Sequence, residues 1–160
     1  MSRLPPLRPR SSRKPQRFSI VASRFNEQYV QGLVDHATAE LKRLAPRALT
    51  SLHRVPGAFE IPILTRELAL REKPDALLAL GVILQGETSH AENLASSVTD
   101  ALQQIAISYG IPVINAVLSL KTERQARERC LGAKINRGTE AARAAVEIVA
   151  SLRDLQTRAR

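Results

Sequence analysis

The sequence has little cysteine, few aromatic residues and no long apolar run. Its 160 residues include one cysteine, no tryptophan and only 3% aromatic residues. The single cysteine, Cys130, excludes an intrachain disulfide and is typical of a reducing compartment. No apolar run approaches the roughly 18 residues that a membrane helix needs, and the N-terminus lacks the apolar core of a signal peptide. We therefore expect a cytoplasmic protein without a membrane span.

Positive charge is abundant, but it is concentrated at the chain ends. The net charge is +9. Residues 1–17 hold six basic groups, four prolines and no acid, and residues 153–160 add a net +2, which leaves only +1 for residues 18–152. A nearly neutral body with few aromatic rings is unlike a nucleic-acid-binding domain. We expect a basic, Pro-rich disordered tail at residues 1–17, a basic tail at 153–160, and no nucleic-acid partner for the body.

Between these ends, strand-like and helix-like patterns alternate. Short apolar segments that predict strands lie at residues 18–22, 49–55, 75–84 and 113–118. Apolar residues at helical spacing follow each of them, from Asn26 to Pro46, Gly57 to Glu72, Ser89 to Gly110 and Thr122 to Gly132, and a last helix is expected over residues 138–152. This alternation predicts one α/β domain over residues 18–152. It is a three-layer sandwich, a four-stranded parallel sheet with helices on both faces.

Polar residues mark where three of the helices begin. Asn26 has a residue type that caps helices. Ser89 with Glu92, and Thr122 with Gln125, have the spacing of capping boxes. These pairs predict side chains that satisfy the free N–H groups of the first turns.

Four loops follow the predicted strands, and ligands of parallel sheets bind beyond the carboxyl ends of the strands. These loops are Ser23 to Asn26, Val55 to Glu60, Val82 to His90 and Asn115 to Ser119. We expect the loops to meet at one edge of the sheet and to form the binding site there.

The third loop combines an anion site with a proton carrier. The N–H groups and dipole of the helix that starts at Ser89 favour an anion such as phosphate. His90 is the residue type whose unperturbed pKa suits proton transfer near neutrality. The pattern indicates an enzyme for a small phosphorylated substrate. The alternative is that Thr88 and Ser89 only cap the helix and that His90 is a solvated first-turn residue.

Two other loop residues allow both a binding and a structural interpretation. Phe25, one of few aromatic residues, can stack on a planar ligand or fold back as a hydrophobic plug. Glu60 can bind sugar hydroxyls or simply cap the first turn of a helix.

Six ordered motifs carry a resemblance to a known family. They are Arg24-Phe25-Asn26, Val55-Pro56-Gly57-Ala58-Phe59-Glu60-Ile61-Pro62, Ala79-Leu80-Gly81-Val82-Ile83, Gly86-Glu87-Thr88-Ser89-His90, Gln125-Ala126-Arg127-Glu128-Arg129 and Asn136-Arg137-Gly138-Thr139-Glu140-Ala141-Ala142. Over roughly residues 18–150 the chain resembles the 6,7-dimethyl-8-ribityllumazine synthases of riboflavin biosynthesis. The resemblance implies a flavodoxin-like fold.

The resemblance also implies an activity and roles for named residues. The reaction would condense 5-amino-6-(D-ribitylamino)uracil with 3,4-dihydroxy-2-butanone 4-phosphate, without metal or organic cofactor. His90 would shuttle protons, and Arg129 would bind phosphate together with Glu87 and Thr88. The pyrimidine and its ribityl chain would contact Phe25, Ala58, Phe59, Glu60, Val82, Ile83, Leu84 and Asn115. Asn115 and Arg129 would enter the site of a neighbouring subunit, so a homopentamer would be the minimal active unit, with riboflavin synthase as a candidate partner.

Some positions depart from the pattern of that family. It commonly has an aromatic residue at Asn115 and at Ala91, Gly at Ala116, a basic residue at Gln85 and Lys at Arg137. Two alternatives to the active enzyme follow: a weakly active paralogue that binds riboflavin-like ligands or mainly assembles, and a basic-tailed particle protein that captures nucleic acid.

Overall fold

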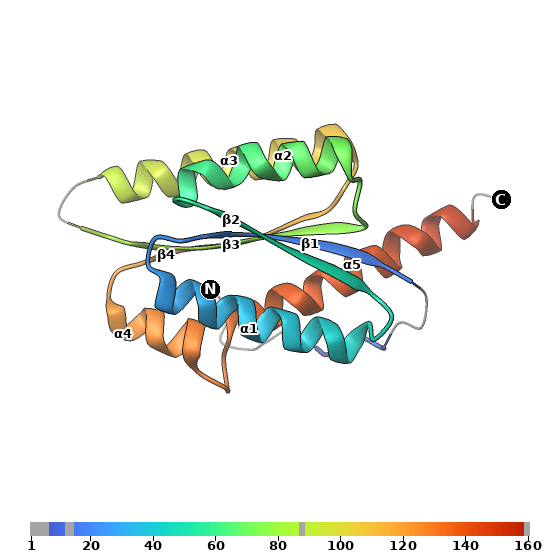
Figure 1. Cartoon of the computed structure of the whole chain (residues 1–160), viewed down its shortest axis with the longest axis horizontal. Coiled ribbons are helices and arrows are strands. Elements are labelled where there is room, and N and C mark those ends of the chain that lie inside the picture. Colours follow the sequence, from blue (N-terminus) through green and yellow to red (C-terminus); the bar gives the residue numbers. More distant parts are fainter. Residues whose placement is uncertain (1–6, 12–14, 87–88, 159–160) are drawn as a thin grey trace.

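The computed structural model describes residues 7–11, 15–86 and 89–158, and it has three layers (Figure 1). The elements in chain order are β1 (Arg17–Ser23), α1 (Glu27–Leu44), β2 (Leu49–Val55), η1 (Ala58–Glu60), α2 (Ile61–Arg71), β3 (Ala76–Leu84), α3 (His90–Tyr109), β4 (Val113–Leu120), α4 (Glu123–Ala126), η2 (Arg127–Leu131) and α5 (Arg137–Arg158). Helices α2 and α3 cover one face of the sheet, and α1, α4 and α5 cover the other.

The four strands are parallel and lie in the order β2-β1-β3-β4. This arrangement confirms the predicted three-layer α/β sandwich. All four carboxyl ends lie at the same edge, at the left of Figure 1. Strand β3 has neighbours on both sides and helices on both faces, and its side chains from Ala76 to Ile83 are buried. That position explains the uninterrupted apolar run in its sequence.

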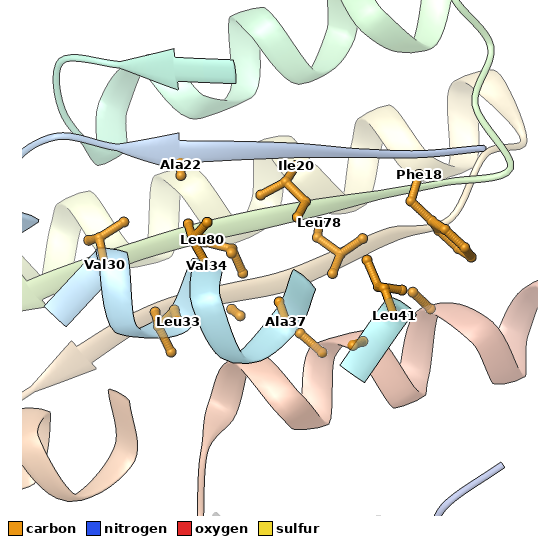
Figure 2. Close-up of a cluster of buried hydrophobic side chains, with 14 of the residues drawn as sticks. Phe18, Ile20, Ala22, Val30, Leu33, Val34, Ala37, Leu41, Leu78 and Leu80 are labelled. Atoms are coloured by element: carbon orange, nitrogen blue, oxygen red, sulfur yellow. The ribbon is translucent and has the colours of Figure 1, made fainter. Parts of the chain in front are cut away.

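Successive side chains of β1 point to opposite faces of the sheet and belong to two separate hydrophobic cores. Phe18, Ile20 and Ala22 point toward α1, where they pack with Leu78 and Leu80 of β3 (Figure 2). Val21 points the other way, into the cluster under α2 and α3. The period of two along a strand therefore fixes which helices cover which face.

Two glycines allow α1 to approach the C-terminal part of the chain very closely. A Cβ placed on Gly138, at the start of α5, would lie 2.1 Å from the carbonyl oxygen of Leu33. A Cβ on Gly32 would lie 2.5 Å from the carbonyl oxygen of Cys130 in η2. Any larger residue would force the backbones of α1, η2 and α5 apart.

The predicted caps are formed at only one of the three helices. Asn26 has a left-handed backbone (φ 57°) and makes no side-chain cap bond, and Ser89 makes none either. Both predictions are wrong. Asn26 does not have the extended backbone of a side-chain cap, and its side-chain amide donates to the Val82 carbonyl. Thr122 does cap α4, since its Oγ1 accepts a hydrogen bond from the Gln125 N–H at 3.2 Å.

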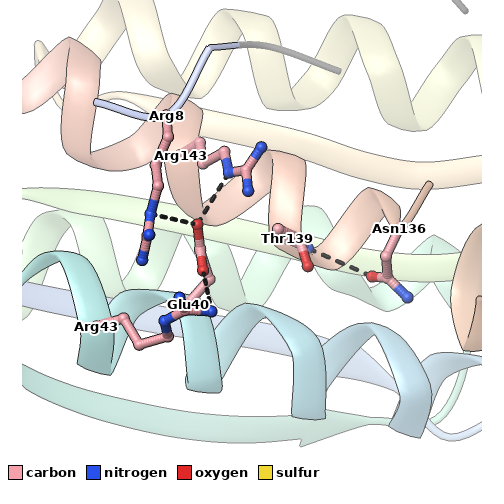
Figure 3. A network of polar contacts seen from close by, with 6 residues as sticks. All are labelled: Arg8, Glu40, Arg43, Asn136, Thr139 and Arg143. Atoms are coloured by element: carbon pink, nitrogen blue, oxygen red, sulfur yellow. Dashed lines mark hydrogen bonds and ion pairs between the residues drawn. The ribbon is translucent and has the colours of Figure 1, made fainter. Parts of the chain in front are cut away.

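The N-terminal segment contacts the folded body through a buried carboxylate. Glu40 of α1 is almost fully buried, and its oxygens lie 3.5 Å from Arg8 Nε, 3.8 Å from Arg43 Nη1 and 2.9 Å from Arg143 Nε (Figure 3). Arg8, in the tail predicted over residues 1–17, therefore contacts both α1 and a residue that also pairs with α5. The predicted tail is one residue too long, because Arg17 begins β1.

The last helix is longer than its sequence pattern predicted. Instead of ending at Leu152, α5 continues to Arg158. Arg153 Nη2 donates to Asp75 Oδ1 at 2.9 Å and to the Pro15 carbonyl at 3.1 Å, which ties this part of the helix to the amino end of the sheet. Across the described part of the chain, none of the helices is both long enough and apolar enough to span a membrane.

Candidate functional site

Three of the four predicted loops are joined by hydrogen bonds at the carboxyl edge of the sheet. The Arg24 N–H donates to the Val55 carbonyl at 2.8 Å, and the Phe25 N–H donates to the Pro56 carbonyl at 3.0 Å. The Asn26 amide donates to the Val82 carbonyl at 2.8 Å. The loops after β1 and β2 and the carboxyl-terminal end of β3 therefore form one connected rim.

Two phenylalanines of this rim are turned to solvent. The side chain of Phe25 is 72% exposed and that of Phe59 is 66% exposed. The alternative that Phe25 folds back as a plug is wrong for this chain. Exposed aromatic rings held on hydrogen-bonded loops are suited to stacking on a flat ligand.

The segment Ala58-Phe59-Glu60 forms the short helix η1 that leads into α2. A Glu60 carboxylate oxygen (Oε2) accepts a hydrogen bond from the Gly57 N–H at 2.8 Å. The capping interpretation of Glu60 is thus confirmed, and the half-buried carboxylate still lies at the rim. Ala58 is buried, so it can offer a ligand only its backbone.

The end of β3 presents backbone to this rim. The pairing of β1 with β3 stops at Leu80, whereas β3 stays paired with β4 as far as Leu84. The side chains of Val82 and Ile83 are buried, so a ligand can meet only their peptide groups. The peptide groups of successive residues in a strand point to opposite sides. Those of Val82 and Leu84 point toward the edge of β3 that β1 no longer covers. The Val82 carbonyl already accepts one hydrogen bond, from the Asn26 side-chain amide.

His90 is the first residue of α3 and is exposed. It follows the β3 loop directly, at the N-terminal end of a 20-residue helix. The predicted phosphate-binding residues Glu87 and Thr88 lie outside the described residues. In the described part of the chain, His90 is thus the titratable group that the β3 loop brings to the carboxyl edge.

Asn115 does not join this rim. It is the third of eight residues in β4 and pairs with Ala79, well before the end of β3. Its Nδ2 donates to Thr99 Oγ1 at 3.1 Å, and its Oδ1 accepts from the Val117 N–H at 3.0 Å. The expectation that Asn115 lies at the carboxyl end of its strand is wrong, because β4 continues to Leu120.

Arg129 lies on the other side of the sheet from His90. It is half-buried in η2, a π-helical turn that packs against α1. The next residue, Cys130, belongs to the core under α1 and α5, whereas α3 packs in the opposite core. The chain therefore divides the predicted site residues into two groups, with Arg129 and Asn115 apart from the rim.

The only cysteine is not a candidate nucleophile. Cys130 is buried, and burial raises the pKa of its thiol to about 12. The thiolate, which is the reactive form, is therefore negligible near neutral pH. Among the described residues, we find no group of three His, Cys, Asp or Glu side chains arranged to hold a metal ion.

Asn136 is a polar residue to which the sequence patterns assigned no separate role. It is 3% exposed and makes hydrogen bonds to both η2 and α5. An Asn placed directly before a helix is a recognised capping signal, which could have identified half of this role.

Comparison with known proteins assigns the chain to a family. The model of the 6,7-dimethyl-8-ribityllumazine synthase family matches residues 15–153. The chain belongs to this family.

Several relatives named 6,7-dimethyl-8-ribityllumazine synthase are similar over most of their length. The relative from Halorhodospira halophila is 38% identical over 141 residues, which are 88% of this chain and 90% of the relative. The one from Paraburkholderia phymatum is 42% identical over 133 residues, 82% of this chain and 75% of the relative. That from Azoarcus sp. strain BH72 is 38% identical over 144 residues, 89% of this chain and 90% of the relative.

The positions that depart from the lumazine synthase pattern have ordinary structural partners in this chain. Ala91 is buried in the core under α2 and α3. Gln85 Nε2 donates to Ser119 Oγ at 3.3 Å and thereby joins the ends of β3 and β4. Arg137 forms an ion pair with Glu140 one turn along α5.

Proposed function

We propose that the rim formed by the loops after β1 and β2 and by the carboxyl-terminal end of β3 is the substrate site of a 6,7-dimethyl-8-ribityllumazine synthase. Family membership makes the chain such an enzyme, a transferase of riboflavin biosynthesis. The observation that carries the site proposal is the pair of exposed phenylalanines, Phe25 and Phe59, on loops joined by the hydrogen bond from Phe25 to Pro56.

The rim offers suitable contacts to the pyrimidine substrate, 5-amino-6-(D-ribitylamino)uracil. Phe25 stacks on the pyrimidinedione ring, for which an exposed aromatic face is required. Ala58, Phe59 and Glu60 bind the ribityl chain, and the half-buried Glu60 carboxylate can accept hydrogen bonds from the ribityl hydroxyls. The peptide groups of Val82, Ile83 and Leu84 bond to the ring edge.

The start of α3 serves the second substrate, 3,4-dihydroxy-2-butanone 4-phosphate. Glu87 and Thr88, in the loop before α3, hold the phosphate near the helix N-terminus, where the dipole favours an anion. His90 takes and returns protons while the substrate amine condenses with the carbonyl and phosphate and water leave. An exposed His90 beside this loop is accessible to a substrate.

The division of the site residues within one chain supports a site shared between copies. Arg129 and Asn115 lie away from the rim, so we propose that they complete the rim of a neighbouring subunit in a homopentamer. A second feature supports self-association. Between α2 and α3 there is a groove of about 430 Å³ whose apolar lining includes the partly or largely exposed side chains of Phe59, Pro62 and Ile63. Exposed apolar patches of this kind commonly mark interfaces.

Three finer assignments extend this proposal. We place the enzyme in the cytoplasm because its single, buried cysteine suits a reducing compartment. Riboflavin synthase, which would use the product, is the proposed protein partner. The folded domain is proposed to span residues 17–158, which adds Arg17 of β1 and the end of α5 to the predicted range of 18–152.

We expect His90→Ala to slow lumazine formation by up to about 10²-fold, the lower end for a general acid–base group, because the condensation proceeds partly unaided. The measurement is product formation from both substrates by purified protein, with unfolding monitored in parallel. His36→Ala, on α1, is the control and should leave the rate unchanged. If His90→Ala were as active as the parent at every pH, His90 would be a solvated first-turn residue. Absence of product from the unmodified protein would favour the non-catalytic paralogue.

We expect the protein to elute as an assembly of at least five chains. Size-exclusion chromatography with light scattering, at low and high salt, measures the mass. A variant lacking residues 1–11 tests whether the basic segment, as a source of like charge, limits assemblies of several pentamers at low salt. An active monomer under all conditions would contradict the shared site.

A further inference from the structure

Asn136 uses the whole hydrogen-bonding capacity of its side chain. Its Nδ2 donates to the Cys130 carbonyl at 2.8 Å and to the Gly132 carbonyl at 3.2 Å. Its Oδ1 accepts from the Gly138 N–H at 2.9 Å and from the Thr139 N–H at 3.3 Å, the latter bond drawn in Figure 3. An amide side chain has two donor hydrogens and two acceptor lone pairs. One buried side chain therefore fastens the end of η2 to the start of α5.

The segment that Asn136 holds is an unusual one. The Gly132 N–H donates to the Arg127 carbonyl at 3.1 Å, which closes the wide turn of a π-helix. Carbonyl groups at the end of a helix lack partners within it, and here Asn136 supplies the partner for two of them. π-helical turns are frequent at functional sites because they displace a side chain from its α-helical position.

The residue next to Arg129 is fixed from two directions. The Cys130 carbonyl receives the Asn136 amide, and it also lies where a Cβ on Gly32 would be 2.5 Å away. The backbone that carries Arg129 is thus held between α1 and the start of α5. Arg129 itself is half-buried. Two parallel bonds between a guanidinium and a phosphate need a well-defined geometry, which is best kept when the segment that carries the arginine is itself held in place.

We propose that Asn136 is a positioning residue for Arg129: by holding the last turn of η2, it sets the place from which the Arg129 guanidinium reaches the substrate phosphate. This inference rests on the proposed function, in which Arg129 binds that phosphate. Asn136 is buried and does not contact substrate itself, but by this inference it contributes to the recognition of the butanone phosphate.

Asn136→Ser separates the two halves of the bonding pattern. Serine keeps a neutral oxygen that caps α5, but it is too short to donate to Cys130 and Gly132. We expect the KM for the butanone phosphate to rise about 10-fold, since a displacement of the order of 1 Å is costly at such a site. The KM for the pyrimidine should change less than about twofold. Inhibition by inorganic phosphate should weaken by the same factor as the butanone phosphate KM.

Thr122→Ala is the matched control, because it removes a hydrogen bond at the other end of the α4 and η2 segment. It should leave both KM values unchanged. If it raised the butanone phosphate KM as much as Asn136→Ser does, general loosening of the segment would explain the effect and the inference would be overturned. Asn136→Asp, which keeps both acceptor bonds and the shape, serves as a second variant should Asn136→Ser fail to assemble.

A double-mutant cycle with Arg129→Ala decides whether Asn136 acts through Arg129. In the Arg129→Ala background, Asn136→Ser or Asn136→Asp should change the butanone phosphate KM by less than about twofold. Additive effects would overturn the inference, because Asn136 would then act by another route, including charge repulsion by the new aspartate. If Arg129→Ala raises that KM but neither Asn136 variant does, positioning by Asn136 is refuted and the proposed function stands. If Arg129→Ala itself has no effect, the phosphate role of Arg129 fails and the inference falls with it.

Discussion

Replacing Arg129 with alanine is expected to raise the KM for the butanone phosphate by roughly 10- to 150-fold. A hydrogen bond between charged groups contributes about 1.5–3 kcal/mol, and this range of free energy corresponds to that range of affinity. The KM for the pyrimidine should stay close to its original value, because the proposed contact of Arg129 is with phosphate alone. Steady-state kinetics with each substrate varied in turn measures both constants.

Arg127→Ala provides the matched control for this prediction. Arg127 lies in the same turn, its side chain is exposed, and its Nη2 is 3.8 Å from a Glu123 carboxylate oxygen. An exposed ion pair of this kind contributes little, so both KM values should be retained. Equal weakening of both substrates by Arg129→Ala would instead assign Arg129 a role in folding or in the contact between subunits.

Gly138→Ala is expected to destabilise the folded protein by about 3 kcal/mol or more, as overpacking against a rigid neighbour does. Alanine normally favours a helix over glycine by about 1 kcal/mol. Here the steric cost is larger, because the new Cβ would lie 2.1 Å from the Leu33 carbonyl oxygen, which belongs to backbone and cannot rotate away. Helices α1 and α5 would have to separate along their contact.

Urea unfolding at a fixed protein concentration measures this effect, since assembly makes the apparent stability depend on concentration. Gly86→Ala is the control, because in the described part of the chain a Cβ at Gly86 has no atom within 4 Å beyond its chain neighbours. We expect it to unfold near the midpoint of the parent protein. An unchanged midpoint for Gly138→Ala would show that α1 and α5 adjust without cost.

The pattern of apolar residues was sufficient to predict the layers and the strand direction. The apolar run at β3 indicated a strand covered on both faces. The helical spacing of apolar residues indicated the helices that follow the strands. The rule that ligands meet the carboxyl ends of parallel strands then predicted the rim with Phe25 and His90. Periodicity is a local property and the position of the carboxyl ends follows from topology, so both can be inferred from the sequence.

The wrong predictions concern residues whose partners are distant in the sequence. Asn26 was expected to cap its own helix, but the Val82 carbonyl, 56 residues away in the chain, takes its amide. Arg17 was expected to end the basic tail, but it begins β1, and its N–H donates to Asp75 Oδ2, 58 residues away. Asn115 was assigned to the carboxyl end of its strand. The strand β4 extends further, because its last two residues, Ser119 and Leu120, pair with Ile83 and Leu84 of β3. None of these partners is visible in a local window of sequence.

By itself, the sequence determined the order of strands and helices, the motifs of the lumazine synthase family, and the loops that carry Phe25, Phe59 and His90. Only the tertiary structure decided which of these residues meet. It joined the β1 and β2 loops and the end of β3 into one rim, placed Arg129 across the sheet from His90, and made Asn136 the link between η2 and α5. The physical reason is that periodicity and capping signals act over a few residues. Contacts between distant segments are selected instead by close packing and by the need of every buried polar group for a partner.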